Sequence, residues 1–384
     1  MNTVREVVAV AVVALCLMVG CNGAGVDANT LPVDPSGPAN PARQSLDVAP
    51  SQVDVQPAAQ LKFAATVSSA NVVWSVSEGA AGGTITGDGV YTAPSSPGTY
   101  HIVATTTGTA SRTGTAVVTV GASDASSANV RAFGAVGDGV TDDTAAFQAA
   151  AATGKDLFIP GTSAHYKLTG RVDVHGSVRG DGSMPEIRMY GATGSRDHAH
   201  TIFALDDYSG PGAVFSGLHL NGQWDGGASG EWDHGIQIQA SSNVTIENNL
   251  IENAYGDDIV LDQLNGAGSA NVIVRNNTLK NPRRCAVAII AAVNVVVDGN
   301  TISKQNNYVS AVDLEPDPGT NDAVGQVQIT SNTFAVATTA VLLYNWDGMP
   351  TQSDVTVTGN SGSAGSFYQS VGAWNAVNVS GNAF

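Results

Sequence analysis

One short phrase returns along the second half of the chain and constrains the fold more than any other feature. A clear copy is Asn243-Val-Thr-Ile-Glu-Asn-Asn249, in which β-branched and polar residues alternate. Such alternation is typical of a strand with one buried face, and recurrence at intervals of 22 to 32 residues indicates stacked repeats. The sequence therefore predicts an all-β parallel β-helix, whose coils align side chains in columns about 4.8 Å apart. The last copy closes at Asn382, and the closing residues that we expect to be structural are Asn249, Asn277, Asn300, Asn332 and Asn360.

Composition narrows the partners of this chain. Its 384 residues leave room for two or three domains, and its formal net charge is −17. An acidic surface repels phosphate backbones, so we expect no nucleic-acid partner. An anionic polysaccharide remains a candidate partner if a divalent cation bridges it to the protein. The sequence leaves Ca²⁺ open as such a cofactor, although it contains no EF-hand loop, and it leaves the formation of a homo-oligomer open.

The N-terminus predicts export. Arg5 precedes an apolar run that is too short for a membrane span, and the run ends at Gly20-Cys21. This end resembles a bacterial lipobox, which implies a signal peptide at residues 1–20 and lipidation of Cys21. The implied location is the cell envelope, with the lipid in the outer membrane or at the cell surface; the alternative is an ordinary secretory signal. Cys285 would then be the one thiol left free, and we expect it to be buried and in no disulfide.

Two further segments separate this signal from the repeats. Residues 21–48 are rich in Pro, Gly, Ala and Asn and predict a flexible tether. Residues 49–121 contain short alternating runs between Gly, Pro and Ser turns, which is typical of an antiparallel β-sandwich. This stretch resembles bacterial immunoglobulin-like (Ig-like) domains, in which a residue such as Trp74 packs in the core. The resemblance implies a spacer or a weak binding module.

The stretch from Asn129 to Gln148 resembles the N-terminal signature of the pectate-lyase-like superfamily, which includes pectate lyases and rhamnogalacturonase–epimerase-like domains. The resemblance implies a single-stranded right-handed β-helix over residues 129–384. Asp142 and Asp143 lie where a helix beginning at Thr144 needs acceptors and negative charge. We interpret them as capping residues of a helix that covers the first coil, with a catalytic role as the alternative.

A second strand recurs in each repeat and aligns its residues across coils. Alternation within this strand predicts that Asp258, Asp262, Asp313 and Glu315 face outward. Asp257 shares a column with His234, and Arg283 and Arg284 begin the following strand. Carboxylates serve hydrolysis, whereas elimination and epimerisation need a base together with a cation. The predicted catalytic residues are His234, Asp257, Asp258, Asp262 and Arg284.

Residues 233–249 and the following Gly256-Asp257-Asp258 resemble two central coils of the polygalacturonases. The chain departs from that family because His234 stands where its first Asp would be, and Cys285 replaces its His. The Asp pair is also displaced by one position, and no Arg-Ile-Lys motif follows. The family mechanism is therefore not carried over, and Asp257 and Asp258 remain an acid pair whose alternative role is turn formation.

Aromatic residues suit the binding of sugar rings. The predicted substrate-binding residues are Trp224, Trp232, Tyr255, Arg283, Asp313, Glu315, Tyr344 and Trp346. The alternative for the aromatic residues is packing of loops onto the β-helix. For the run from Asp313 to Asp317, the alternatives are a metal or sugar-hydroxyl site and a solvated strand edge.

These patterns favour an envelope-anchored protein that acts on polysaccharide. The expected enzyme is a glycoside hydrolase or polysaccharide lyase that modifies a glycan, including uronic-acid-containing ones, by hydrolysis, β-elimination or epimerisation. The alternative is a non-catalytic glycan-binding or adhesion module, since one fold hosts both.

Overall fold

The computed structural model describes residues 46–55, 57–66, 71–107, 111–120, 126–162, 164–227, 230–306, 308–318 and 322–384. The predicted signal peptide, the predicted lipidation site Cys21 and nearly all of the predicted tether lie outside these residues. Within the described ranges, no helix is long and apolar enough to span a membrane.

Residues 46–120 form small sheets around a core of their own. A four-stranded sheet has the order β2-β9-β8-β5, a three-stranded sheet the order β3-β7-β6, and β1 pairs with β4. Phe63, Tyr91 and Ile102 are buried between them, and Trp74 packs against this core. The Ig-like class of this region and the domain boundaries stay predictions. The strands are β1 (Val48–Ala49), β2 (Gln52–Val55), β3 (Gln60–Lys62), β4 (Ala64–Ala65), β5 (Val72–Val76), β6 (Thr84–Ile85), β7 (Val90–Thr92), β8 (Gly98–Thr106) and β9 (Thr113–Val120), with the short helix η1 (Gly79–Gly82).

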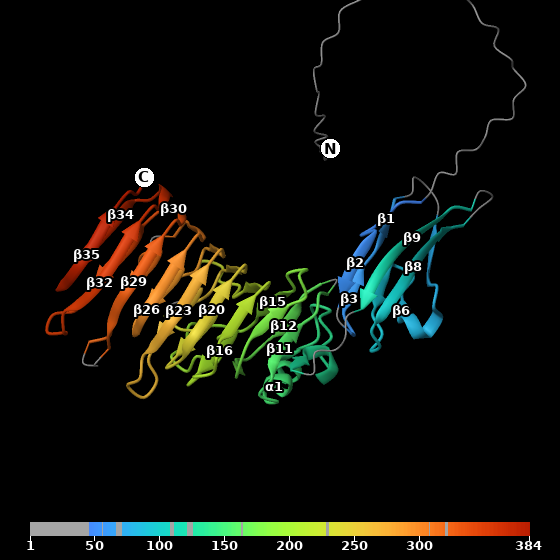
Figure 1. The fold of residues 1–384 in the computed structure, drawn as a ribbon, viewed down its shortest axis with the longest axis horizontal. Helices are drawn as coiled ribbons and strands as arrows, with labels where there is room; N and C mark the ends of the chain where they lie inside the picture. The colour runs from blue at the N-terminus through green and yellow to red at the C-terminus, as the bar shows by residue number, and fades with distance from the viewer. Residues whose placement is uncertain are drawn as a thin grey trace, which may run out of the picture. The chain divides into compact units, whose positions relative to one another are not determined.

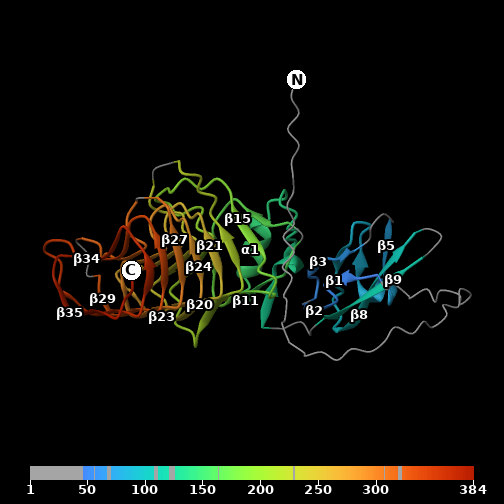
Figure 2. The ribbon, with the colours of Figure 1, turned by 90° about the horizontal axis from the view of Figure 1, so that it is seen from above.

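The rest of the described chain is a right-handed parallel β-helix, as predicted. Each coil contributes one strand to each of three parallel sheets, so that strands distant in sequence lie side by side (Figure 1) and successive coils stack (Figure 2). The ten-stranded sheet contains β10 (Ser127–Asn129), β11 (Asp156–Ile159), β14 (Val178–Gly180), β17 (Ala213–Ser216), β20 (Ser242–Glu247), β23 (Ser269–Arg275), β26 (Ala292–Asp298), β29 (Val324–Thr330), β32 (Gln352–Thr358) and β35 (Trp374–Ser380).

The other two sheets have eight strands each. The β12 sheet contains β12 (Tyr166–Leu168), β15 (Glu186–Met189), β18 (His219–Asn221), β21 (Leu250–Glu252), β24 (Thr278–Lys280), β27 (Thr301–Lys304), β30 (Thr333–Val336) and β33 (Ser361–Ser363). The β13 sheet contains β13 (Val172–Val174), β16 (Phe203–Asp206), β19 (Ile236–Gln239), β22 (Ile259–Asp262), β25 (Val287–Ile289), β28 (Val312–Leu314), β31 (Thr339–Tyr344) and β34 (Ser366–Val371).

A helix covers the first coil, as predicted. It is α1 (Thr144–Ala151), which packs near η2 (Val130–Phe133) and against β13. Phe147 of α1 is fully buried and meets Tyr166 edge-on, with ring centroids 5.2 Å apart. Oδ1 of Asp142 accepts the backbone N–H of Thr144 at 3.0 Å. Asp143 instead accepts the N–H of Val136 and Gly137, so its carboxylate fastens the preceding turn to the start of the helix.

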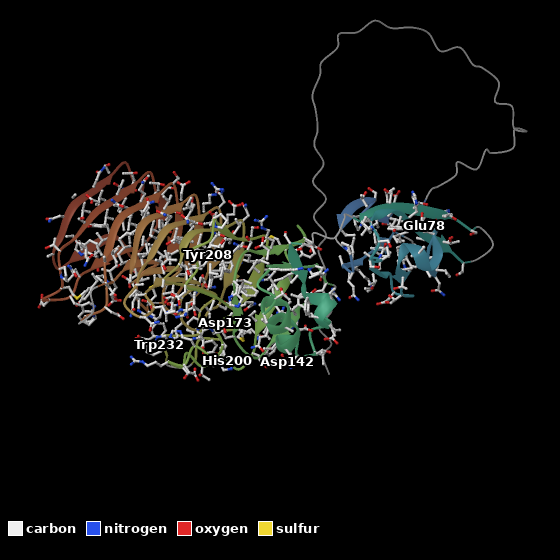
Figure 3. The ribbon with its side chains drawn as sticks, turned by 60° about the horizontal axis from the view of Figure 1, so that its bottom comes forward. Glu78, Asp142, Asp173, His200, Tyr208 and Trp232 are labelled. Atoms are coloured by element: carbon white, nitrogen blue, oxygen red, sulfur yellow. The ribbon has the colours of Figure 1, made fainter. Side chains whose placement is uncertain are left out.

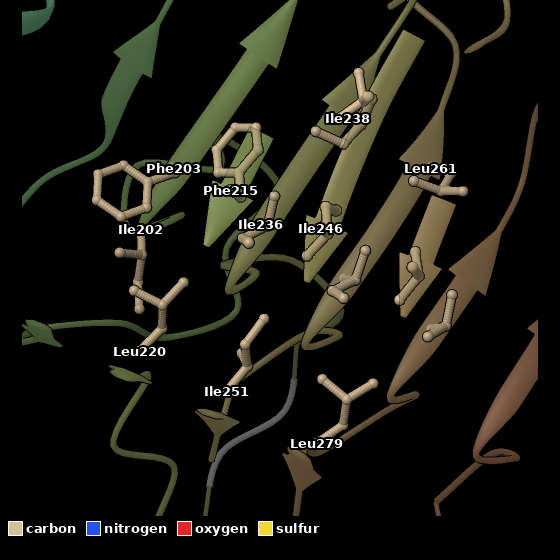
Figure 4. Close-up of a cluster of buried hydrophobic side chains, with 14 of the residues drawn as sticks. Ile202, Phe203, Phe215, Leu220, Ile236, Ile238, Ile246, Ile251, Leu261 and Leu279 are labelled. Carbon is tan, nitrogen blue, oxygen red and sulfur yellow. The ribbon is translucent and has the colours of Figure 1, made fainter. Parts of the chain in front are cut away.

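Aliphatic residues in register fill the interior. In the β13 sheet, Ile236 pairs with Ile259, which pairs with Val287, and the column continues through Val312 to Val341. All five are fully buried, and the three sheets point such side chains at one another (Figure 4). Burying the side chain of a Val or Ile contributes about 1.5–3 kcal/mol, so each coil is stabilised mainly by its neighbours.

The closing Asn of the repeated phrase forms a buried ladder. Nδ2 of Asn277 donates to Oδ1 of Asn300 at 3.1 Å and to the carbonyl of Ile246 at 2.9 Å. The same contacts recur from Asn249 to Asn382. The first Asn of the phrase has a different role, which is to form a left-handed turn. Asn271 and Asn294 adopt φ values of 54° and 55° there. The ladder thus satisfies turn backbone that would otherwise be buried without partners.

We expect replacement of a ladder Asn to destabilise the β-helix. Asn300→Ala removes an acceptor from Asn277 and a donor from the carbonyl of Val274, which should cost about 3 kcal/mol of unfolding free energy. The matched control is Asn294→Gly, which keeps the left-handed turn and loses an exposed contact, for a cost of about 0.5 kcal/mol. Denaturant unfolding measures both, and equal losses would contradict the structural role of the ladder.

Candidate active site

A groove of about 510 Å³ crosses the outer face of the β13 sheet. Its floor comes from β19, β22, β28 and β31, with Ile290 contributing directly after β25, so it runs from coil to coil across five successive strands. Four strand spacings of about 4.8 Å give it a length of about 19 Å along the axis. Most of the predicted site residues line it, namely His234, Asp257, Asp262, Arg284, Asp313, Glu315, Trp232, Tyr344 and Trp346.

Strand register explains why residues as distant in sequence as Val260 and Leu342 both line the groove. Val260 pairs with Ala288, Ala288 with Asp313, and Asp313 with Leu342. These four side chains therefore form one outward-facing column across the β13 sheet. The backbone bonds continue this register into the turn before β22, where the N–H of Gly235 donates to the carbonyl of Asp257. Asp257 therefore follows His234 in its column, as predicted.

Asp257 is held by three neighbours at the floor of the groove. Nδ1 of His234 lies 3.1 Å from the backbone nitrogen and 3.3 Å from Oδ2 of Asp257. The backbone N–H of Cys285 donates to Oδ1 at 2.8 Å. Burial alone would raise the pKa of Asp257, but the charge of Arg284 and the contacts with His234 and Cys285 outweigh it and lower this pKa. Asp257 is therefore ionised at neutral pH.

Arg284 lies among acids. Its guanidinium nitrogens are 3.6 Å from a carboxylate oxygen of Glu231 and 3.6 Å from one of Glu315. The charge of Asp257 is the main cause that raises the pKa of Arg284. The Arg284 side chain is only 17% exposed and lines the groove between these two carboxylates.

The pKa of Asp313 is shifted in the opposite direction to that of Asp257. It is 1% exposed, and among the described residues Oδ1 has no hydrogen-bond partner. Sγ of the buried Cys285 lies 3.7 Å from Oδ2. Burial first, and then the nearby charge of Glu315, raise the pKa of Asp313 to about 8. The Asp313 carboxyl is therefore protonated at neutral pH, and Cys285 contacts this protonated acid and the ionised Asp257 at once.

Three further acids of the groove, Asp262, Glu315 and Asp317, also have a raised pKa. Burial is the main cause for Asp262, Glu315 and Asp317. Gln239 donates to Asp262 at 3.3 Å and partly stabilises its charge. A solvated strand edge is thus the wrong interpretation for Asp313 and Glu315, because both line an enclosed floor.

Aromatic residues stand at both ends of the groove. Trp232 lies at one end, beneath the guanidinium of Arg196 at 4.7 Å from its ring centroid and edge-on to His198. Trp232 and His200 come from the loops at one edge of the β-helix (Figure 3). At the other end Tyr344 meets Trp346, with centroids 4.8 Å apart. Trp346 is 38% exposed, so its ring is open to a ligand.

Asp258 does not face the groove, and the prediction that it points outward is wrong. It is completely buried, and neither carboxylate oxygen has a hydrogen-bond partner among the described residues. β22 begins only at Ile259, so the alternation of the strand does not extend back to Asp258. Burial raises the pKa of Asp258 well above its usual range, which keeps its carboxyl neutral.

Three other predicted residues also lie outside the groove. The guanidinium of Arg283 stacks on Tyr308 at 4.9 Å, and Trp224 meets the same ring edge-on. Trp224 also donates to the carbonyl of Gly227, as expected of a residue that packs its own loop. Tyr255 is partly buried and does not line the groove.

Sequence reasoning missed Arg196, His198 and Gln237, which do line the groove. Arg196 and His198 come from the irregular connection between β15 and β16, which carries no repeat signal. Gln237 shares the column of Asp313, and that register could have revealed it. Within the described ranges, no group of three or more His, Cys, Asp or Glu side chains is arranged to hold a metal ion.

Comparison with known proteins supports the fold. Residues 229–384 match the family described as "Right handed beta helix region". No curated protein matches the chain.

Several solved structures are similar to this chain at low sequence identity. They include PfbA, a surface adhesin of Streptococcus pneumoniae (16% identity, TM-score 0.38, covering 62% of this chain and 79% of that one). Another is tailspike protein gp49 of the Acinetobacter baumannii bacteriophage Fri1, a capsular polysaccharide depolymerase (14%, TM-score 0.46, 70% and 56%). A third is a GH87 α-1,3-glucanase of Streptomyces thermodiastaticus (17%, TM-score 0.35, 85% and 84%).

The two floor acids should affect stability with opposite signs. Native Asp313 keeps its proton up to about pH 8, whereas an unfolded Asp loses it near 3.8, so its burial costs more stability as pH rises between these values. Asp313→Asn should therefore stabilise the protein at pH 7, with a gain that grows from pH 4 to 8. Native Asp257 has a lowered pKa, so it stabilises the fold above the unfolded pKa, and Asp257→Asn should cost about 3 kcal/mol at pH 7. Thermal unfolding from pH 4 to 8 measures both; a destabilising Asp313→Asn would contradict the buried, neutral acid.

Proposed function

We propose that this protein hydrolyses the glycosidic bonds of a polysaccharide bound in the groove. The observation that carries the proposal is the pair of acids joined by Cys285. Asp257 is ionised and Asp313 protonated at the same pH, because one faces Arg284 and the other is buried against a thiol. Two neighbouring carboxyl groups whose surroundings give them very different pKa values are typical of an acid–base pair.

The step uses both acids. Asp313 gives its proton to the glycosidic oxygen as the bond between that oxygen and the anomeric carbon breaks. Asp257 takes a proton from a water whose oxygen bonds to the anomeric carbon. The products are a new reducing end and a free hydroxyl, with Asp313 left ionised and Asp257 protonated. Transfer of one proton from Asp257 back to Asp313 through solvent restores both acids.

Hydrolysis is favoured over elimination and epimerisation by the state of Arg284. Those reactions need a cation that neutralises a carboxylate of the substrate next to the proton removed. Arg284 is already within 3.6 Å of Glu231 and of Glu315, and its charge also stabilises Asp257. It is therefore better suited to keep Asp257 ionised than to bind a uronate.

The location of the activity rests on the sequence. The predicted lipidation of Cys21 would hold the enzyme at the cell envelope, where polysaccharides are encountered. The predicted tether and Ig-like region would then act as a spacer.

Removal of either acid should abolish turnover. We expect Asp257→Asn and Asp313→Asn each to lower kcat/KM about 10²- to 10⁴-fold, measured as new reducing ends on a panel of polysaccharides. Activity of the native protein should fall above about pH 8, as Asp313 loses its proton. The matched control is Asp258→Asn, a neighbouring buried acid outside the groove, which should keep activity within a few-fold.

Three results would argue against the proposal. Unsaturated products that absorb in the ultraviolet would indicate elimination instead. Full activity of Asp313→Asn would refute its role as the acid. Retention on a glycan gel without any product would leave the non-catalytic binding module.

A further inference from the structure

The charges that line the groove are strongly unequal. Six carboxyl groups face it, against two guanidinium groups, those of Arg196 and Arg284. Even with Asp313 neutral, five carboxyl groups remain. The acids are Glu231, Asp257, Asp262, Asp313, Glu315 and Asp317.

Neither guanidinium is placed to neutralise the negative charges of a bound ligand along the length of the groove. Arg284 is engaged with Glu231 and Glu315 and is mostly buried. Arg196 lies over the face of Trp232 at one end, four strands from Tyr344 at the other. A polymer with a carboxylate or sulfate on each sugar would therefore place most of its charges against acids of the same sign, at a cost that the low dielectric of the groove increases.

The same floor suits hydroxyl groups. Ionised carboxylates accept hydrogen bonds from sugar hydroxyls, and Gln237 supplies an amide on the same surface. Trp232 at one end and Tyr344 with Trp346 at the other offer apolar faces to sugar rings. The length of about 19 Å between these ends, along the coil axis, accommodates several rings in a row.

We propose that the substrate is an uncharged glycan that lies along the axis of the β-helix, across the coils, with its outer sugars stacked on Trp232 and on Trp346. This inference rests on the proposed function, because only an enzyme has a substrate. The binding of an uncharged glycan can nevertheless be tested without measuring turnover. It narrows the sequence-based expectation, which included uronic-acid-containing glycans.

The test is affinity electrophoresis of the full chain in gels that contain one polysaccharide each. Neutral glucans, xylans and mannans form one set, and polygalacturonate and alginate the other, at pH 5 and pH 8, with and without Ca²⁺. We expect retardation by at least one neutral polymer at both pH values. We expect none by the anionic set at pH 8, where Asp262, Glu315 and Asp317 are most ionised.

Aromatic variants locate the binding. Trp232→Ala and Trp346→Ala should each weaken retardation by the neutral polymer about tenfold, the loss of about 1.4 kcal/mol of stacking. The matched control Trp224→Ala removes a Trp outside the groove and should bind as the native protein does. Equal losses in all three would overturn the assignment of the binding surface.

The outcomes separate the two proposals. Binding of a neutral polymer without cleavage supports the uncharged ligand and overturns hydrolysis. Retardation by polygalacturonate or alginate alone, with or without Ca²⁺, overturns the uncharged ligand, and new reducing ends from that polymer would still support hydrolysis. Failure of every neutral polymer to bind also overturns the inference.

Discussion

Parallel pairing of each strand with the equivalent strand of the next coil is the constraint on which this structure depends. It fixes a spacing of about 4.8 Å and forbids a slip by one residue, since a slip would turn the buried aliphatic column outward. The Asn ladder reinforces the same register inside the turns, from Asn249 to Asn382. Because this register is fixed, the acids that separate coils contribute to the groove are held at fixed positions relative to one another.

Register explains both the success and the limits of prediction from sequence. The β-helix followed from repeats and alternation, and the column from His234 to Asp257 followed from aligning equivalent positions of successive repeats. Asp258 was misplaced because it precedes β22, and a turn obeys no period of two. Arg283 was misplaced for a similar reason, since it lies in the turn before β25 and its guanidinium contacts Tyr308 instead. Arg196 and His198 were not predicted to line the groove, because the sequence of an irregular loop contains no periodic pattern.

The groove brings together groups that are costly to bury. Asp257, Asp313 and Arg284 form a network in which the protonation of each acid depends on the neighbouring charges, and Asp258 adds a further buried carboxyl nearby. Clusters of this kind destabilise a fold relative to apolar packing, and they persist where their electrostatics serve a purpose. The flanking coils, whose cores consist of buried aliphatic and aromatic side chains, supply the stability that compensates for this cost.

The floor and the ends of the groove come from different kinds of backbone. Asp262 and Asp313 lie on strands that the stacking holds rigid, whereas Trp232 and Arg196 lie on connections that leave the coil between one sheet and the next. Insertions or deletions in such connections leave the pairing of the strands intact. Evolution or engineering could therefore exchange the proposed ligand preference of this scaffold by grafting new connections, while the acids of the floor stay in place.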